Sequence, residues 1–137
     1  MNRIKDKIIE IEKYLEQLEF VLPSDLEEYK NDFKIKLMGE RSFERIIEAV
    51  IDLSFLVVNE KNFRKPDEEE GIFDVLKSNK IISEILSEKL KDAKGMRNII
   101  SHQYGKINDE LVFHSLVEEL IPNVNEFLEA IKNLKFV

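Results

Sequence analysis

Cysteine is absent from the sequence, and histidine occurs only twice, at His102 and His114. The absence of cysteine excludes disulfides and thiolate metal sites, and two histidines are too few for an ordinary structural zinc site. We therefore expect any chemistry of this chain to need no metal and no cofactor. The sequence also lacks a Gly-rich phosphate loop, the Ser-His-Asp order of hydrolases and internal repeats, which removes the commoner enzyme classes.

Basic residues are outnumbered. The chain has 21 Lys and Arg against 28 Asp and Glu, which gives a formal net charge of −7. A protein that holds nucleic acid through a broad basic surface is therefore excluded, and any contact with RNA must be local. An acidic chain suits a basic partner protein, although solubility alone explains the balance equally well.

Long apolar runs are missing as well. No segment has the length of a transmembrane helix, and the amino-terminal residues run into a charged amphipathic segment with no signal-peptide core. We expect a cytoplasmic protein that makes no use of a membrane. Only four glycines and three prolines are present, which leaves little room for loops.

Helical periodicity is what the sequence has in abundance. Hydrophobic residues make up 43% of the chain and charged residues 36%, and no useful stretch alternates like a strand, so we predict an all-α protein. The length suits a single helical domain spanning residues 1–137. The first helix, which Pro23 ends, is predicted by apolar residues at steps of three and four: Ile4, Ile8, Ile11, Leu15, Leu18 and Leu22.

A second helical region, residues 26–61, is too long for a typical single helix. We expect a break or bend at Gly39, because glycine weakens a helix interior. Beyond Gly39 the region is apolar around much of its circumference, since Leu53, Phe55 and Leu56 extend its main stripe. A helix so widely apolar is usually buried on more than one side. We expect a second copy of the chain, in a symmetric homodimer, to cover the extra surface.

Two acidic residues interrupt this apolar region. Glu48 and Asp52 are the only charges in the stretch 46–58, and they share one helical face because they lie four residues apart. They could support a catalytic group by orienting Arg97 or His102. They could equally occupy the last exposed strip of the helix and have no chemical role.

Residues 62–71 form the one clear connector, marked by a proline, a glycine and a change of charge sign. Its acidic run, residues 67–70, is typical of solvated surface. Arg64 and Lys65 could instead contact an RNA backbone.

The last long helix follows a second break. Asn108 is a candidate N-cap for it, and Pro122 is expected to kink it because proline deletes a backbone hydrogen bond. His114 lies near the start of this helix among apolar residues. We expect it to be a packed or surface histidine and not a catalytic one.

The most informative stretch is residues 95–105, which reads Gly-Met-Arg-Asn-Ile-Ile-Ser-His-Gln-Tyr-Gly. At about 100° per residue, a helix here gathers its polar groups on one side, opposite an apolar stripe of Met96, Ile99 and Ile100. These polar groups are Lys94, Arg97, Asn98, Ser101, His102 and Tyr104.

The arginine and the histidine of this arc suit phosphodiester cleavage. Arg97 can hold a phosphate through its planar, permanently charged guanidinium, and His102 can transfer a proton near neutral pH. The alternative is that Arg97 solvates a helix edge while His102 caps the helix end or satisfies a buried carbonyl.

The pattern Arg97-x4-His102-x-Tyr104, preceded by Gly-Met and followed by an acidic helix, resembles the HEPN-domain ribonucleases of the HepT-like toxin group. Residues 44–53 resemble the second helix of that family, and the helix order fits across most of the chain. The resemblance implies an HEPN-like antiparallel bundle of four to five helices. It also implies a homodimer in which two motifs face one composite cleft and cut RNA without a metal.

The resemblance further implies the toxin of a type VII-like toxin–antitoxin pair. Arg97 and His102 would be its catalytic residues, with Asn98 and Ser101 as candidates for positioning the substrate. Tyr104 would be the residue to which a nucleotidyltransferase antitoxin attaches AMP, placing a phosphate beside Arg97. Two alternatives stay open: a non-catalytic helical module that complements the nucleotidyltransferase, and a purely structural helical dimer.

Overall fold

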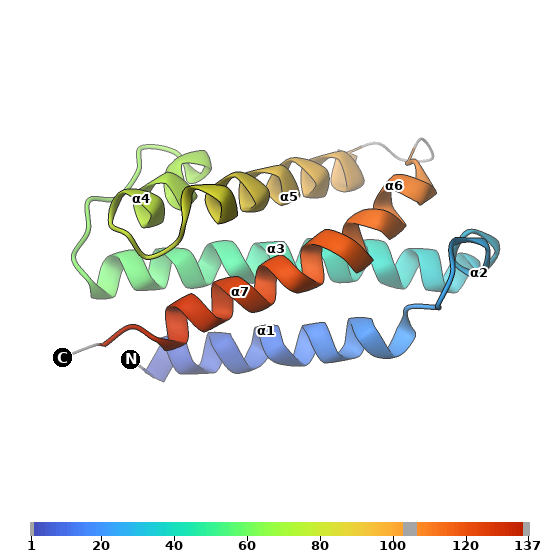
Figure 1. Cartoon of the computed structure of the whole chain (residues 1–137), viewed down its shortest axis with the longest axis horizontal. Coiled ribbons are helices and arrows are strands. Elements are labelled where there is room, and N and C mark those ends of the chain that lie inside the picture. The colour runs from blue at the N-terminus through green and yellow to red at the C-terminus, as the bar shows by residue number, and fades with distance from the viewer. Residues whose placement is uncertain (1, 103–106, 136–137) are drawn as a thin grey trace.

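The computed structural model describes residues 2–102 and 107–135, and it is helical throughout these ranges apart from the connections (Figure 1). The all-α prediction is confirmed. The long helices α1, α3, α5 and the continuous α6–α7 run antiparallel to their neighbours in the chain. The bounds are α1 Asn2–Val21, α2 Leu26–Asn31, α3 Phe33–Glu60, η1 Glu69–Gly71, α4 Ile72–Ser78, α5 Glu84–His102, α6 Asp109–His114 and α7 Ile121–Lys132. Within the described ranges, none of these helices combines the length and apolarity needed to cross a bilayer.

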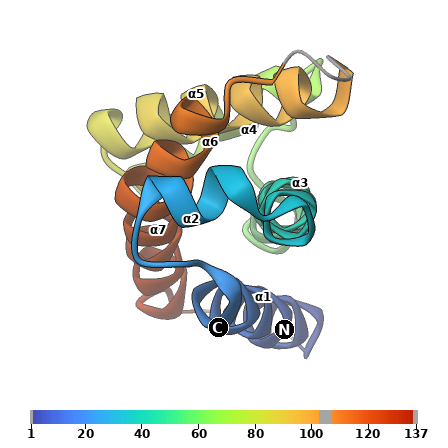
Figure 2. The same cartoon turned by 90° about the vertical axis from the view of Figure 1, so that its right-hand side faces the viewer.

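Helix α3 is the longest element and lies at the centre of the fold. It packs against α1 on one side and against α4 and α5 on another, while α2 crosses the end of the bundle between α3 and α6 (Figures 1 and 2). Leu53 is fully buried, and Phe55 and Leu56 are half-buried against the core. The apolar surface that we expected a second copy to cover is therefore covered by the chain itself, so it gives no argument for a homodimer.

The break in the second helical region lies at Asp32, and the prediction of a break at Gly39 is wrong. The Asp32 carboxylate caps α3 by accepting hydrogen bonds from the backbone N–H groups of Lys34 and Ile35, at 3.0 and 3.2 Å. Gly39 lies inside α3, where a Cβ atom would stand 3.1 Å from the Tyr29 hydroxyl and 3.2 Å from Leu116. The glycine thus serves close packing between helices.

The last helix confirms one expectation and refines another. The Asn108 side chain accepts a hydrogen bond of 3.1 Å from the Leu111 N–H, so it is the N-cap of α6 as predicted. The kink expected at Pro122 takes the form of a π-helical turn at Ser115–Leu120, directly before α7. A wider turn there accommodates the missing N–H and the ring of the proline.

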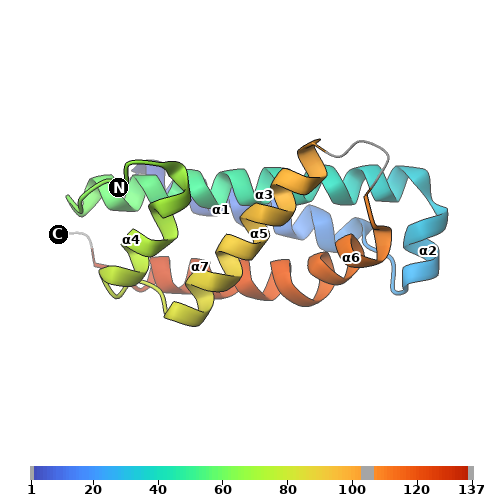
Figure 3. The same cartoon turned by 90° about the horizontal axis from the view of Figure 1, so that it is seen from above.

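Helix α5 carries the motif and runs obliquely over α3 (Figure 3). It begins after Ser83, whose hydroxyl accepts a hydrogen bond of 3.0 Å from the Leu86 N–H. Leu86 and Leu90 anchor it in the core near its start, and Ile100 does so near its end. The opposite face of α5 is thereby left to meet the connector between α3 and α4.

Candidate functional site

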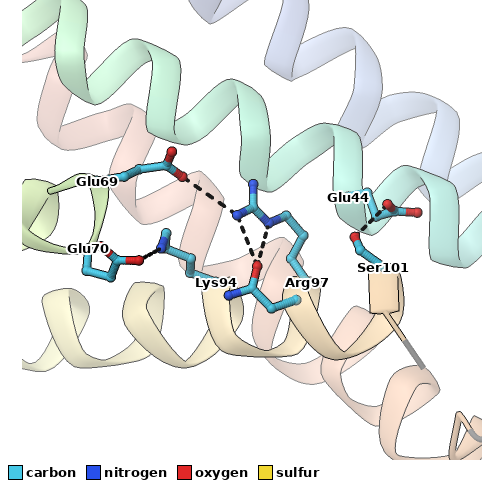
Figure 4. Close-up of polar contacts among 7 residues, drawn as sticks. Glu44, Glu69, Glu70, Lys94, Arg97 and Ser101 are labelled. Atoms are coloured by element: carbon cyan, nitrogen blue, oxygen red, sulfur yellow. Dashed lines mark hydrogen bonds and ion pairs between the residues drawn. The ribbon is translucent and has the colours of Figure 1, made fainter.

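Arg97 is held in place by two neighbours. Its Nε and Nη2 atoms donate hydrogen bonds of 3.3 and 3.1 Å to the Asn98 side-chain oxygen, and Nη2 lies 3.6 Å from a carboxylate oxygen of Glu69 (Figure 4). Only 18% of the Arg97 side chain is exposed. An arginine that merely solvated a helix edge would not be covered in this way, so the structure argues against that alternative.

Lys94, one turn before Arg97, is still more deeply covered. Its side chain is 9% exposed, and its ammonium lies 3.4 Å from the Glu70 carboxylate (Figure 4). A hydrogen bond from the backbone of Glu70 itself, and then the Lys94 ammonium, hold the pKa of the Glu70 carboxyl below its usual range. The polar face of α5 therefore presents two cations that both meet carboxylates of η1.

Ser101 ties the carboxyl end of α5 to α3. Its hydroxyl donates a hydrogen bond of 2.8 Å to a carboxylate oxygen of Glu44 (Figure 4). Glu44 was not among the residues predicted from the sequence, although it lies one helical turn before Glu48 on α3. The Ser101 hydroxyl thus already donates its hydrogen bond within the protein, so a substrate that accepted from it would compete with Glu44.

His102 is the final residue of α5, and it is exposed. Among the described residues, none forms a hydrogen bond to its imidazole. On a regular helix Arg97 and His102 lie about 140° apart, so one copy of the helix directs them to different places. Tyr104 lies outside the described residues. The apolar stripe is also incomplete, because Ile100 is buried whereas Ile99 remains 41% exposed.

Glu48 and Asp52 are not brought to the motif. They line a hollow on the α1 side of α3, where the Asp52 carboxylate lies 3.9 Å from the Lys7 ammonium. The same hollow includes Tyr14, whose ring lies 4.1 Å from the Arg45 guanidinium. Within one copy of the chain, the structure thus shows these two acidic residues facing α1, away from the α5 residues they were expected to orient.

The acidic run 67–70 is exposed, as expected for solvated surface, but two of its residues also contact α5. Glu69 and Glu70 keep 48% and 69% of their side-chain exposure, yet both carboxylates turn toward α5 (Figure 4). Composition gives no signal for this contact, because an acidic run looks alike whether or not cations face it. Arg64 and Lys65 are exposed and line a separate shallow hollow on the connector.

His114 is a surface residue, in agreement with the expectation. Its side chain is 52% exposed, and its Nδ1 atom lies 2.9 Å from the Glu118 carboxylate one turn later. Nothing in this position relates it to the α5 motif.

Two hollows are relevant to binding. One, of about 390 Å³, lies beside the motif and is lined by Glu70, Asp74, Lys91, Lys94, Gly95 and Asn98. A larger one, of about 640 Å³, is mostly apolar, lies between α1 and α3 and shares no residue with the motif. Of the predicted polar arc of α5, the first hollow includes Lys94 and Asn98. Within residues 2–102 and 107–135, no cluster of three His, Asp or Glu side chains is suited to a metal ion.

Comparisons with known proteins identify the family to which this fold belongs. The family model described as ribonuclease HepT-like matches residues 11–131. An mRNA nuclease HepT of Shewanella oneidensis is 28% identical over 129 residues, covering 94% of this chain and 96% of the relative. A tRNA nuclease HepT of Aphanizomenon flos-aquae is 26% identical over 121 residues, covering 85% and 82%.

Solved structures show the same fold. A toxin–antitoxin complex with AMP-PNP has a chain that superimposes with a TM-score of 0.89 at 25% identity, covering 98% of this chain and 100% of that one. A tri-AMPylated Shewanella oneidensis HEPN toxin in complex with its MNT antitoxin gives a TM-score of 0.87 at 27% identity, covering 96% and 97%. The chain is therefore similar to HEPN toxins over nearly its whole length.

Proposed function

The chain belongs to the HepT-like ribonuclease family, and we propose that it is the toxin of a type VII-like toxin–antitoxin pair, which cuts RNA internally through Arg97 and His102. The observation that carries this assignment is the covered position of Arg97, fixed by Asn98 on the polar face of α5. A fixed guanidinium can stabilise a phosphoryl group without reorganising during the reaction. The relatives named as nucleases support the same reaction class.

The proposed reaction is an attack by the ribose 2′-oxygen on the adjacent phosphorus. His102 removes the 2′-hydroxyl proton or donates a proton to the leaving 5′-oxygen, and Arg97 stabilises negative charge on the phosphoryl oxygens. The bond from phosphorus to the 5′-oxygen breaks as the bond to the 2′-oxygen forms. The products are a 2′,3′-cyclic phosphate and a 5′-hydroxyl, with no metal in the reaction. DNA is spared because it lacks the nucleophile.

Two copies of the chain complete the site in this proposal. Arg97 and His102 diverge on one helix, whereas two motifs across a twofold axis can supply an arginine and a histidine to one phosphate. Ile99 is 41% exposed and lies about 60° from His102 around the helix, so it gives the histidine side of α5 an apolar surface for a second copy. We therefore place the homodimer contact along the carboxyl half of α5.

Regulation is proposed to follow that of the AMPylated relative. The Tyr104 phenol would attack the α-phosphate of ATP on a nucleotidyltransferase antitoxin, forming a phosphodiester and releasing pyrophosphate. The attached nucleotide would add negative charge near Arg97, which would weaken the hold of that residue on RNA. The complex of a tri-AMPylated HEPN toxin with an MNT antitoxin supports this partner class.

The test is RNA cleavage by purified protein in EDTA, comparing wild type with Arg97→Ala and His102→Ala. We expect each substitution to lower the rate by about 100-fold or more, at unchanged helicity and dimer mass. Cleavage ending in a 3′-hydroxyl would contradict the mechanism. If an unmodified wild type, verified by intact mass, binds a nucleotidyltransferase but cuts no RNA, the chain is a non-catalytic binding module.

A further inference from the structure

Burial of Lys94 is the observation that the cleavage mechanism leaves unexplained. Its side chain is 9% exposed in a chain of net charge −7, and its ammonium meets a Glu70 carboxylate that is itself 69% exposed. An ion pair with a largely solvated carboxylate contributes little stability, so it does not by itself explain why the side chain of this lysine is covered. Packing alone would be served as well by an apolar residue of the same length.

Lys94 and Arg97 form a pair on one helical face. They are three residues apart on α5, so their side chains lie next to each other. Two cations that close repel unless anions lie between or beside them. In the structure, the anions are the carboxylates of Glu69, at 3.6 Å from Arg97, and Glu70, at 3.4 Å from Lys94. Successive residues of η1 thus present successive negative charges, as a nucleic-acid backbone does.

The space beside this pair has room for a nucleotide. The hollow of about 390 Å³ contains Lys94 and Asn98, and pockets of about 300 Å³ or more hold small ligands. Gly95 forms part of its lining, and nothing in the described chain lies within 4 Å of the point where a Cβ would stand. Internal packing therefore does not require a glycine here, although glycine weakens a helix interior. Its missing side chain leaves room for a group from outside the chain.

From these contacts we infer that Lys94 binds a second RNA backbone phosphate, next to the one held by Arg97, and that Glu69 and Glu70 occupy both cations until RNA displaces them. The inference rests on the proposed function and adds a binding site to it. Lys94 is a positioning residue here, because it touches a phosphate that does not react. Glu70 competes with that phosphate for the Lys94 ammonium.

The test measures binding of a short fluorescein-labelled 2′-O-methyl RNA, which has no free 2′-hydroxyl and cannot be cut by the proposed reaction. Lys94→Met keeps the length of the side chain and removes its charge. We expect the Kd to rise about three- to ten-fold, and the slope of log Kd against log salt concentration to fall by about 0.7, the value for one phosphate contact on a single strand. Glu70→Gln should lower the Kd two-fold or more.

Matched controls lie on another face of the molecule. Glu12 and Lys132 form an ion pair of 2.7 Å between α1 and α7. Glu12→Gln changes the net charge by the same amount as Glu70→Gln, and Lys132→Met matches Lys94→Met. Neither control should alter the salt slope by more than a fraction of the Lys94→Met effect. Circular dichroism of every variant shows whether the helices persist.

A purely structural role for the pair predicts the reverse pattern. Glu70→Gln would then lower the melting temperature and leave the Kd unchanged, which would overturn the inference. It would also be overturned by a folded Lys94→Met protein with the wild-type Kd and salt slope, or by a wild type that binds no RNA. A wild type that binds with the expected Lys94 dependence but cuts no natural RNA would refute the proposed cleavage and leave the phosphate site standing.

Discussion

Ser101 on α5 donates a hydrogen bond of 2.8 Å to the Glu44 carboxylate on α3, and this bond holds the end of the motif helix against α3. We expect Ser101→Ala and Glu44→Ala each to lower the free energy of unfolding by about 1 kcal/mol, because each removes one partner of a half-buried hydrogen bond. The double variant should lose little more than either single one, and urea unfolding measures this coupling.

Cleavage rates of the same variants separate two roles for Ser101. If its hydroxyl serves only to fasten α5, both variants should slow cleavage to the same extent. A rate that falls ten-fold or more for Ser101→Ala, but not for Glu44→Ala, would show that the hydroxyl also contacts RNA.

The two helix-interior glycines should respond in opposite directions to alanine. A Cβ on Gly39 would press on Tyr29 and Leu116, at 3.1 and 3.2 Å, so Gly39→Ala should destabilise the fold. A Cβ on Gly95 would meet open space, so Gly95→Ala should stabilise it by up to about 1 kcal/mol. Thermal unfolding of the pair is the measurement, and a lower melting temperature for Gly95→Ala would contradict the open geometry.

Tyr29 carries a buried hydroxyl with no hydrogen-bond partner among the described residues. Its burial, and then the carboxylates of Glu40 and Asp109, raise the pKa of this phenol above its ordinary value. Tyr29→Phe should therefore leave the free energy of unfolding unchanged or raise it by up to about 1 kcal/mol, because the ring contact with Phe113 remains. Chemical denaturation of this variant provides the measurement.

Tyr14 supplies the matched control for that substitution. Its hydroxyl donates a hydrogen bond of 2.6 Å to Glu10, so Tyr14→Phe should be destabilising. Equal losses in the Tyr29 and Tyr14 variants would mean that the Tyr29 hydroxyl is satisfied in solution.

Glu40 should give the fold a distinctive pH dependence. Burial raises the pKa of its carboxyl, the Asp109 carboxylate raises it further, and the Lys36 ammonium partly opposes them. A carboxyl whose pKa is higher in the folded state favours folding below its unfolded value of 4.5, and this contribution is lost as the pH rises through the folded pKa. Glu40→Gln should therefore raise the melting temperature at pH 7 and have little effect below about pH 4.5.

Glu126, exposed on α7, provides the comparison for that pH profile. Glu126→Gln should give a melting temperature close to that of wild type at both pH values. A Glu40→Gln protein that was less stable than wild type at pH 7 would show that the Lys36 ammonium dominates the site.

Periodicity was sufficient for the helices and for the polar face of α5, because both depend on residues close in the chain. Periodicity could not show whether Glu44 or Glu48, one turn apart on α3, contacts the motif helix. That choice depends on where α1 and α5 pack around α3, which no local pattern encodes. The apolar surface of α3 could not be assigned to a second copy for the same reason, since helices of the same chain bury Leu53 and half-bury Phe55 and Leu56.

The contact between the connector and α5, and the position of the break between α2 and α3, were missed for other reasons. Glu69 and Glu70 reach Lys94 and Arg97 across a turn of irregular backbone, and an acidic run has the same composition whether or not it meets cations. A break or bend was expected at Gly39, yet the break lies at Asp32, whose side chain caps α3 through local hydrogen bonds to Lys34 and Ile35. Gly39 itself is required by a tertiary contact, the close approach of Tyr29 and Leu116 to α3.

The π-helical turn at Ser115–Leu120 keeps two halves of one helix in phase. Val112 lies before it, Val124 and Phe127 lie after it, and all three face the core. A π turn takes up one additional residue without rotating the helix beyond it, so deleting one residue there should restore a regular helix whose two halves still face the core. A one-residue deletion inside the regular part of α7 would instead rotate everything beyond it by about 100° and turn that face out of the core. The π turn is therefore a place where this helix can lose a residue and keep its packing.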